Sequence, residues 1–275
     1  MTLMDGKRGL IMGVANKRSI AWGIARACAE HGAALAFSYQ NEALRRRIEP
    51  LAHSVNSGLL YACDAADADS LDSLFANLER DMGQIDFLVH AIGFSDKNEL
   101  RGRYVDTSRD NFLTSMDVSV YSFTAVAARA EKLMSDSGSL LTLTYYGAEK
   151  VMPHYNVMGV AKAALEASVR YLAADLGRNG IRVNAISAGT IKTLAASGIG
   201  DFRYILKWNE LNSPLERNVT IQDVGNAALY LLSDLGSAVT GEILHVDSGY
   251  HVVGMKRVDA PDIATVSTAD ESKRQ

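Results

Sequence analysis

The sequence predicts an α/β fold: a single-domain Rossmann-type doubly wound parallel sheet of seven strands, in the order 3-2-1-4-5-6-7, flanked by helices. Short apolar runs alternate with longer segments of helical period, which is typical of a parallel sheet covered by helices. The runs are apolar throughout rather than alternating, as expected for strands buried on both faces. A chain of 275 residues, 48% of them hydrophobic, can form one large core, and we expect this domain to span residues 1–255.

Turn-forming residues mark the ends of each expected strand and helix. The expected strands are Arg8–Gly13, Ala33–Tyr39, Gly58–Cys63, Ile85–His90, Ser139–Leu143, Arg182–Ser187 and Glu242–Val246. The expected helices are Ser19–His31, Asn41–His53, Ala68–Met82, Ser108–Met134, Val157–Leu176 and Ile221–Leu232. Right-handed crossovers then dictate the strand order, and they place a ligand crevice at the carboxyl edge where strands one and four diverge.

Two segments interrupt this alternation. Residues 188–214 contain three glycines and no clear strand, and they follow the carboxyl end of a strand, where lids are usually found. We therefore expect a substrate lid at about residues 190–213. The segment from Lys256 to Gln275 is polar and without periodicity, so residues 256–275 are expected to be disordered.

Composition and charge exclude several classes of function. The net charge of −4 offers no broad positive field for nucleic acid or for an anionic membrane surface. Cys28 and Cys63 have no paired spacing and are expected to be buried thiols, and the scattered histidines give no metal site. The apolar run Gly9–Ala15 is too short to span a membrane and is followed by Lys17 and Arg18, so we expect a cytoplasmic protein.

The turn after the first strand is a candidate diphosphate site. Gly13, Ala15 and Ser19 lead directly into a helix, whose N-terminus offers unpaired N–H groups and the positive end of its dipole. The segment does not match the GxGxxG pattern, because Ala15 and Ser19 stand where glycines are expected. On these residues alone, an ordinary strand-to-helix turn is an equally good interpretation.

The ends of the next strands favour a dinucleotide. Gln40 follows the second strand, where its neutral amide suits a ribose hydroxyl and favours NADH, although Arg45–Arg47 leave NADPH as the less favoured alternative. Asp64 follows the third strand and can accept a hydrogen bond from an adenine amino group. Gly93 follows the fourth strand and allows a cofactor to pass close to the backbone. Taken singly, Asp64 and Gly93 also suit ordinary turns.

A tyrosine and a lysine form the candidate catalytic pair. Tyr155 and Lys162 lie seven residues apart, nearly two helical turns, so we expect both to project from one face roughly 10 Å apart along the axis. A fixed ammonium near a phenol makes it a better donor to a developing oxyanion. From the spacing alone, a pair on the surface of an amphipathic helix is a valid alternative.

These residues carry a family resemblance. The segments Thr142–Tyr145, Tyr155–Lys162 and Arg182–Gly189 resemble the enoyl-acyl-carrier-protein reductases, which use NADH and belong to the short-chain dehydrogenase/reductase superfamily, over residues 5 to about 255. The resemblance is specific, because ordinary members of the superfamily have the lysine four residues after the tyrosine, where this chain has Gly159.

The resemblance implies an activity and assigns roles. A hydride from the nicotinamide would reach the β-carbon of a trans-2-enoyl thioester of bacterial, type II fatty-acid synthesis. Tyr155 would hold the enolate oxygen, Lys162 would hold the nicotinamide ribose, and Tyr145 would orient the substrate. The implied cofactor contacts are Gly13, Ala15, Ser19, Ile20, Gln40, Asp64, Ala91, Ile92, Gly93, Lys162, Ile191 and Thr193. The implied substrate contacts are Phe94, Tyr145, Tyr155, Met158, Ala195, Ile199 and Phe202.

The resemblance also implies partners. Family members act on enoyl chains carried by acyl carrier protein, bind diphenyl-ether inhibitors such as triclosan, and form homotetramers, for which the two longest expected helices are candidate interfaces. Three positions depart from the family pattern: Thr190 replaces a common proline, His154 a common asparagine and Trp22 a frequent tyrosine. The first puts the resting order of the lid in doubt, because proline would fix one backbone angle.

Two other functions compete with this interpretation. A carbonyl reductase or alcohol dehydrogenase on the same fold needs its tyrosine and lysine one helical turn apart, a spacing that this chain lacks. A nucleotide-sensing or scaffold protein would keep the fold without the chemistry, since a fold alone does not establish function. The presence of both Tyr155 and Lys162 argues against it.

Overall fold

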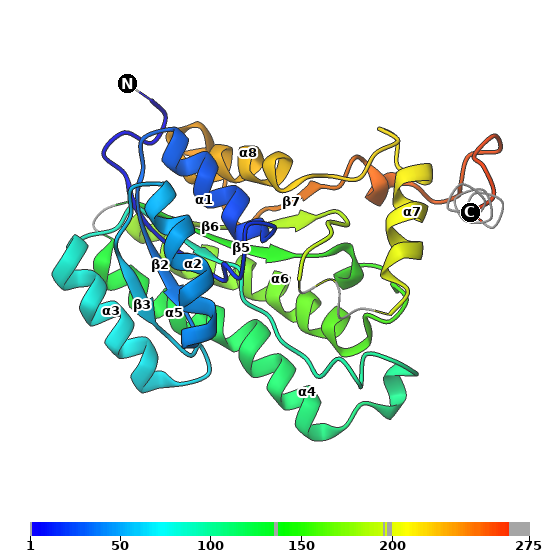
Figure 1. Cartoon of the computed structure of the whole chain (residues 1–275), viewed down its shortest axis with the longest axis horizontal. Helices are drawn as coiled ribbons and strands as arrows, with labels where there is room; N and C mark the ends of the chain where they lie inside the picture. Colours follow the sequence, from blue (N-terminus) through cyan, green and yellow to red (C-terminus); the bar gives the residue numbers. More distant parts are fainter. Residues whose placement is uncertain (1, 135–136, 195, 197–199, 264–275) are drawn as a thin grey trace.

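A seven-stranded parallel sheet forms the centre of the fold (Figure 1). Its strand order, β3-β2-β1-β4-β5-β6-β7, is the one that the sequence predicts. The computed structural model describes residues 2–134, 137–194, 196 and 200–263. All neighbouring strands pair in parallel. The strands are β1 (Arg8–Met12), β2 (Ala34–Tyr39), β3 (Leu60–Ala62), β4 (Phe87–His90), β5 (Gly138–Thr144), β6 (Ile181–Ala188) and β7 (Ile243–Val246).

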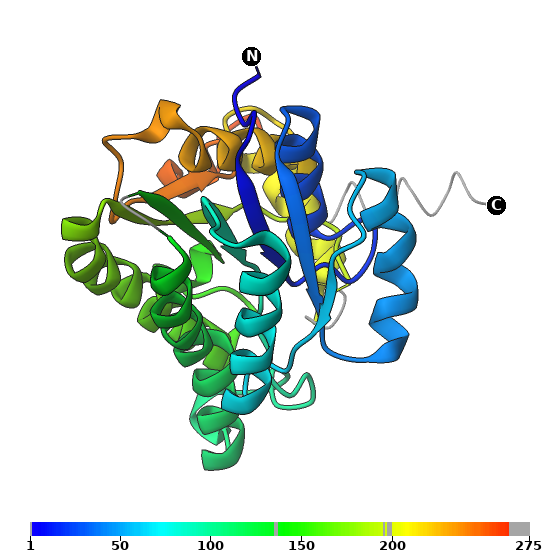
Figure 2. The same cartoon turned by 90° about the vertical axis from the view of Figure 1, so that its left-hand side faces the viewer.

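Helices cover both faces of this sheet, so the strands lie between two helix layers (Figure 2). One face packs against α1 (Ile20–Glu30), α2 (Glu42–Ser54) and α8 (Ile221–Leu232). The other packs against α3 (Ala68–Met82), α5 (Ser122–Ala130) and α6 (Asn156–Leu176). Cys28 and Cys63 are buried free thiols, as predicted, and burial raises their pKa values to about 12 and about 11. No helix in the described part of the chain is long and apolar enough to span a membrane.

Local sequence signals set several of the helix ends. Thr220 accepts from the backbone N–H of Asp223, whose carboxylate accepts in turn from the backbone of Thr220, so α8 begins with a reciprocal capping box. The Asp67 carboxylate accepts from the first-turn amides of α3, and Gly83, with φ +68°, ends the same helix. These caps account for why the predicted bounds of α3 and α8 agree with the structure.

The region expected as one helix from Ser108 to Met134 is interrupted. It consists of α4 (Arg109–Met116), a π-helical segment η2 (Asp117–Tyr121), α5 and the short η3 (Glu131–Leu133). π segments inside helices frequently occur at functional sites. Here the segment carries Ser119, whose hydroxyl accepts from the backbone N–H of Phe94 at 3.0 Å and donates to its carbonyl at 3.1 Å. Apolar periodicity alone gave no sign of this interruption.

The segment after β6 contains a helix beyond the carboxyl ends of the strands. Helix α7 (Phe202–Asn212) lies within the expected lid and stands apart from both helix layers (Figure 1). The first part of the expected disordered tail has defined contacts: Ala260 is buried, and Lys256 pairs with Asp262 at 3.3 Å. Residues 264–275 lie outside the described residues. The remaining short helices are η1 (Tyr104–Asp106), η4 (Tyr146–Ala148), η5 (Gly177–Asn179), η7 (Asp234–Gly236) and η8 (Tyr250–Val252).

Candidate active site

A cavity of about 410 Å³ opens at the carboxyl ends of β1, β4, β5 and β6, where the strand order predicts a ligand crevice. The sheet side of its wall comes from the turns that follow these strands and from α6. The other side comes from Thr190, Ile191, Thr193, Leu194, Ala196, Phe202 and Ile205. Of the residues that the sequence assigned, the cavity wall contains Gly13, Ala15, Ser19, Ile20, Ala91, Ile92, Gly93, Phe94, Tyr145, Tyr155, Met158, Lys162, Ile191, Thr193 and Phe202.

The turn after β1 is shaped for close approach of a ligand to the backbone. Gly13 has φ +94°, and a Cβ there would lie 2.0 Å from the backbone oxygen of Ala91. The Ser19 hydroxyl accepts from the backbone N–H groups of Ala15 and Asn16 at 3.0 and 3.1 Å. Because that hydroxyl faces the turn, no side chain caps α1, and the positive end of the helix dipole is open to an anion.

Gly93 keeps open the space next to Lys162. A Cβ at this position would lie 3.7 Å from Nζ of Lys162 and 3.7 Å from Cε of Met158, which are ordinary contact distances. A side chain here would therefore fit sterically but would occupy part of the cavity. Ser119 holds the adjoining Phe94 backbone, so this edge is fixed from behind by the π segment.

Tyr155 and Lys162 both contribute to the cavity wall, although only Lys162 lies within a helix. Tyr155 is the N-cap of α6, and Lys162 follows in the second turn. Gly159 stands between them, and a Cβ there would lie 2.7 Å from the backbone oxygen of Gly147. The helix therefore passes too close to Gly147 for a lysine at the position that ordinary superfamily members use.

Burial dominates the electrostatics of the pair. It raises the pKa of Tyr155 above its usual value, and the neighbouring Tyr145 and Glu166 raise it further. Burial lowers the pKa of Lys162 to about 8, against the opposing effect of Glu166. Nζ of Lys162 donates to the backbone oxygen of Leu143 at 2.8 Å. The expected acidification of the phenol by the ammonium is not seen: the causes that shift the pKa of Tyr155 all raise it, Lys162 is not among them, and Tyr155 is a neutral hydrogen-bond donor at neutral pH.

Tyr145 packs edge-on against Tyr155, with ring centroids 5.0 Å apart and planes at 74°. Burial raises the pKa of Tyr145 to about 12, partly offset by a hydrogen bond with Thr190. Thr190 also accepts from the buried amide Nδ2 of Asn209 on α7. The threonine that replaces the family proline thus connects Tyr145 with the helix above the cavity.

The remaining assigned residues lie at the two ends of the site. Gln40 and Asp64 stand outside the cavity wall, after β2 and β3, where Nε2 of Gln40 donates to Oδ2 of Asp64 at 3.4 Å. Phe202 lies in the wall at the start of α7. Ala195 and Ile199, to which the resemblance assigns substrate contacts, lie outside the described residues.

Sequence reasoning missed several apolar residues of the wall. Leu100, Met152 and Ile205 line the cavity and pack around Tyr155 and Met158 in one buried cluster. Leu100 and Met152 lie in connecting segments with no periodicity, so nothing in the sequence marked them. Ser119 was also missed, and the only available signal was a serine on the buried side of an expected helix.

The site fits a dinucleotide on three observations of the structure. The glycine at the end of β1 has a conformation and a backbone contact that exclude a Cβ. The first turn of α1 has no side-chain cap. A buried lysine and a buried tyrosine line the far end of the same cavity. Together these features define a Rossmann-type oxidoreductase that takes a nicotinamide dinucleotide.

Comparisons with known proteins give the family. The model of the family described as enoyl-(acyl carrier protein) reductase matches residues 13–251. A Rhizobium meliloti protein named enoyl-[acyl-carrier-protein] reductase [NADH] 1 is 71% identical over 264 residues, which is 96% of this chain and 97% of that protein. The chain belongs to the enoyl-(acyl carrier protein) reductase family.

Solved structures agree with this membership. The enoyl-(acyl-carrier-protein) reductase from Anaplasma phagocytophilum, in complex with NAD, superposes with a TM-score of 0.91 at 62% identity, covering 95% of this chain and 98% of that one. The Bacillus cereus enoyl-acyl carrier protein reductase, with NADP+ and an indole naphthyridinone, gives a TM-score of 0.91 at 50% identity, covering 93% and 100%. The resemblance inferred from the sequence is confirmed.

Proposed function

We propose that this chain reduces trans-2-enoyl-acyl-carrier-protein thioesters to saturated acyl thioesters with NADH, in the elongation cycle of bacterial type II fatty-acid synthesis. Family membership over nearly the whole chain supports the reaction. The observation that carries the proposal is the joint presence of Tyr155 and Lys162 in one cavity, at the seven-residue spacing and with Gly159 packed between them. A ketone reductase with the shorter spacing has no room for its lysine on this helix.

The cofactor would lie across the carboxyl edge of the sheet. Gly13, Ala15, Ser19 and Ile20 would hold its diphosphate at the start of α1. Ala91, Ile92, Gly93, Lys162, Ile191 and Thr193 would surround the nicotinamide end. When bound, the reduced nicotinamide would supply the hydride that the β-carbon of the enoyl chain receives, and protonation at the α-carbon would complete the reduction.

The chain's own residues stabilise the charge that develops on the thioester oxygen. Tyr155, neutral and buried, donates its hydroxyl proton in a hydrogen bond to that oxygen. Lys162 remains largely protonated at neutral pH, since its pKa is about 8, and it places a positive charge beside the site. Tyr145, fixed against the Tyr155 ring, orients the thioester. The apolar surroundings exclude water and strengthen these interactions.

The adenosine end of the site favours NADH over NADPH. Gln40 and Asp64, already hydrogen-bonded to each other, present an amide and a carboxylate, and neither suits a 2′-phosphate. Arg45, the first of the nearby arginines, pairs with Glu42 at 3.5 Å and lies 5.9 Å from the centroid of the Tyr39 ring. It is thus held in other contacts. NADPH is accordingly expected to be the poorer donor.

The acyl chain would occupy the apolar part of the cavity. Phe94, Met158 and Phe202 contribute side chains to its wall, and we assign Ala195 and Ile199 to the same region from the sequence. Acyl carrier protein would present the chain through the opening beside α7, which we propose as the substrate lid. The same pocket would accept diphenyl-ether inhibitors such as triclosan.

The assembly proposed is a homotetramer in the cytoplasm. Large apolar side chains are exposed along the two expected interface helices: Tyr121 is 63% exposed, Val160 37% and Tyr171 76%. These side chains are candidates for burial between the subunits of a symmetric oligomer. Sedimentation showing a stable monomer would contradict this part of the proposal.

A substrate comparison tests the function. Purified protein is offered crotonyl thioester or acetoacetyl thioester, each with NADH or NADPH, and oxidation of the cofactor is followed. We expect preferential reduction of the enoyl thioester and higher catalytic efficiency with NADH. Preferential reduction of the ketone would overturn the assignment. Cofactor binding without oxidation on any enoyl thioester would point instead to a protein that has kept the fold without the chemistry.

A further inference from the structure

Glu166 is a buried carboxyl group that the proposed reaction does not use. It lies on α6 one turn beyond Lys162, and both residues are buried, with exposed fractions of 7% and 8%. Side chains four residues apart on a helix are neighbours on one face. A carboxylate is rarely buried without a compensating partner, so its position behind the catalytic lysine requires an explanation.

Both side chains are anchored to the same end of β5. Nζ of Lys162 donates to the carbonyl oxygen of Leu143 at 2.8 Å, and Oγ1 of Thr144 donates to Oε1 of Glu166 at 2.7 Å. Two consecutive strand residues therefore hold the lysine and the carboxylate. Burial raises the pKa of Glu166, and the hydrogen bond from Thr144 opposes that shift, because a hydrogen bond donated to a carboxylate favours its charged form.

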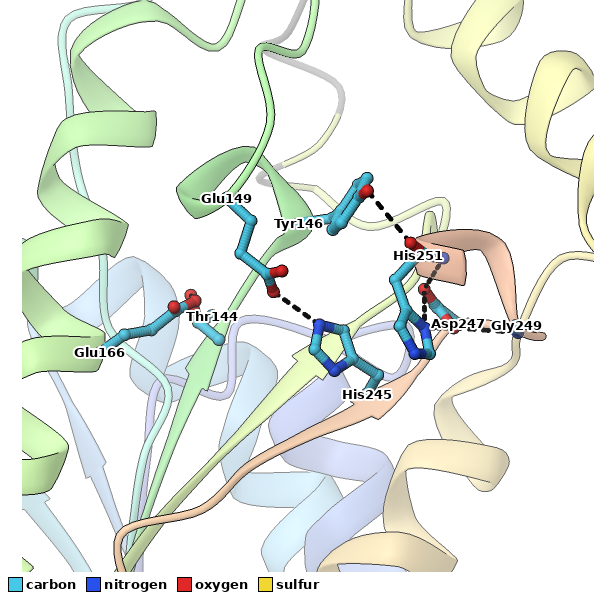
Figure 3. A network of polar contacts seen from close by, with 8 residues as sticks. All are labelled: Thr144, Tyr146, Glu149, Glu166, His245, Asp247, Gly249 and His251. Carbon is cyan, nitrogen blue, oxygen red and sulfur yellow. Dashed lines mark hydrogen bonds and ion pairs between the residues drawn. The ribbon is translucent and has the colours of Figure 1, made fainter. Parts of the chain in front are cut away.

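Few other charges face this pair. On β4, the pKa of buried His90 is lowered to about 3 by burial and by the charge of Lys162, so His90 is neutral. Beyond Glu166 lie Glu149 after β5, Arg170 on α6 and His245 on β7. Figure 3 shows the Glu149 carboxylate turned toward His245, to which it pairs at 2.6 Å. Among the described residues, Glu166 is the only carboxylate that acts appreciably on the charge of Lys162.

We propose that Glu166 is a positioning residue that keeps the Lys162 ammonium charged in the buried floor of the active site. The two groups do not meet as a direct ion pair. The carboxylate acts through the low-dielectric interior, where charges interact more strongly than in water. This inference rests on the proposed function, because it assigns Glu166 a part in the same reaction without contact with substrate.

The direction in which loss of Glu166 should shift the pH dependence follows from the pKa of Lys162. Burial lowers the pKa of Lys162 to about 8, and Glu166 opposes that shift. The ammonium loses its proton as pH rises through its pKa. Without the charge of Glu166, deprotonation therefore moves to lower pH, and the activity that depends on the ammonium is lost earlier on the alkaline side.

The experiment compares Glu166→Gln with the wild-type protein by two readouts. The first is the pH dependence of kcat/KM with crotonyl thioester. The second is the pH dependence of Lys162 acetylation by acetic anhydride in the cofactor-free protein, followed by mass spectrometry. Glutamine keeps the shape and still accepts from Thr144. We expect both midpoints to fall by about one pH unit, equivalent to tenfold lower activity well above the midpoint.

Matched variants separate charge from structure. Glu166→Asp keeps the charge and should restore the wild-type midpoint, whereas Glu79→Gln, which removes a carboxylate from the exposed face of α3, should leave it unchanged. Should Glu166→Gln fail to fold, Thr144→Val tests the same idea, because losing that hydrogen bond makes the Glu166 charge less stable and should shift the midpoint downward by a smaller amount.

The inference is overturned if Glu166→Gln folds and leaves the pH midpoint of Lys162 acetylation unchanged. If Glu166→Gln does not fold, an unchanged midpoint in Thr144→Val has the same meaning. A shift of equal size in Glu79→Gln also overturns the inference. A wild-type protein that reduces no enoyl thioester would instead overturn the proposed function. The acetylation readout remains interpretable in that case, so the two failures are distinguishable.

Discussion

The two walls of the active-site cavity are held in place by different kinds of interaction. The sheet wall comes from strand ends and α6, where backbone and side chains are fixed by parallel pairing and by apolar packing on both faces. The opposite wall, which includes Thr190 and α7, has a buried apolar anchor in Ile205 and is otherwise held by polar contacts. Asn209 reaches Thr190, Trp208 Nε1 donates to the hydroxyl of Tyr250 at 3.1 Å, and His154 pairs with Asp201 at 3.0 Å.

Several buried polar groups in and next to the α7 wall also lack a hydrogen-bond partner among the described residues. The side-chain oxygens of Asn209, Asn212 and Asn218 are buried and have no hydrogen-bond partner. Each such group costs free energy in this position, whereas the sheet wall gains from burial. The sheet wall therefore sets the chemistry and the fold, whereas we expect the α7 wall, which depends more on polar contacts, to shift at a lower cost in free energy. Changes in the first should therefore affect kcat or folding, and changes in the second should affect KM.

The largest expected effect is that of Tyr155→Phe, on the sheet wall. Removing one donor to a developing oxyanion costs about 2.7–4 kcal/mol, so kcat should fall by roughly two to three orders of magnitude. Burial of the ring should keep the fold intact. Steady-state kinetics with crotonyl thioester and NADH measure it. A variant retaining most of its turnover would remove Tyr155 from the mechanism.

Gly13→Ala tests the rigidity of the same wall. The new Cβ would meet the backbone oxygen of Ala91, and φ of +94° is strained for alanine, so we expect a loss of about 2–4 kcal/mol in the free energy of unfolding. Urea denaturation measures it, and NADH binding should weaken in parallel. Gly58→Ala is the matched control, because a Cβ there meets nothing within 4 Å. Equal stability of the two variants would contradict the rigid-wall interpretation.

The same difference explains what the sequence predicted. Buried strands appear in the sequence as apolar runs, and the handedness of the crossovers then determines their order. The sheet and the edge at which the cavity lies could therefore be predicted from local sequence patterns. The places of Gly13, Tyr155 and Lys162 in the cavity wall could be predicted because strand ends and helix spacing determine where they lie. Leu100, Met152 and Asn209 were not found, because their roles depend on contacts between segments that no period connects. The interruption at Ser119 was invisible for the same reason.

On the polar wall, Thr190→Val is expected to act on KM. Valine has the shape of threonine but offers Asn209 and Tyr145 no hydroxyl, which leaves a buried amide unpaired at a cost of about 1–3 kcal/mol. Part of this cost is relieved if α7 shifts, so we expect KM for crotonyl thioester to rise roughly threefold to tenfold, with kcat changed less than twofold. Thr190→Ser keeps the hydroxyl and serves as the control. A fall in kcat at constant KM would assign Thr190 to the chemistry instead.

The smallest expected effect is at the pair between His154 and Asp201, which joins the segment before Tyr155 to the start of α7. The Asp201 side chain is 73% exposed, and solvent screens such a pair, so its contribution should be about 0.2–1 kcal/mol. Asp201→Asn should therefore raise KM less than about fivefold, and the effect should shrink at high salt because the interaction is exposed. A double-mutant cycle with His154→Asn isolates the pair from the individual side chains. The coupling energy of this pair should not exceed that of Thr190 with Asn209, and it should not persist at high salt. Failure of either expectation would mean that the exposed pair between His154 and Asp201, and not the buried amides, mainly holds the α7 wall in place.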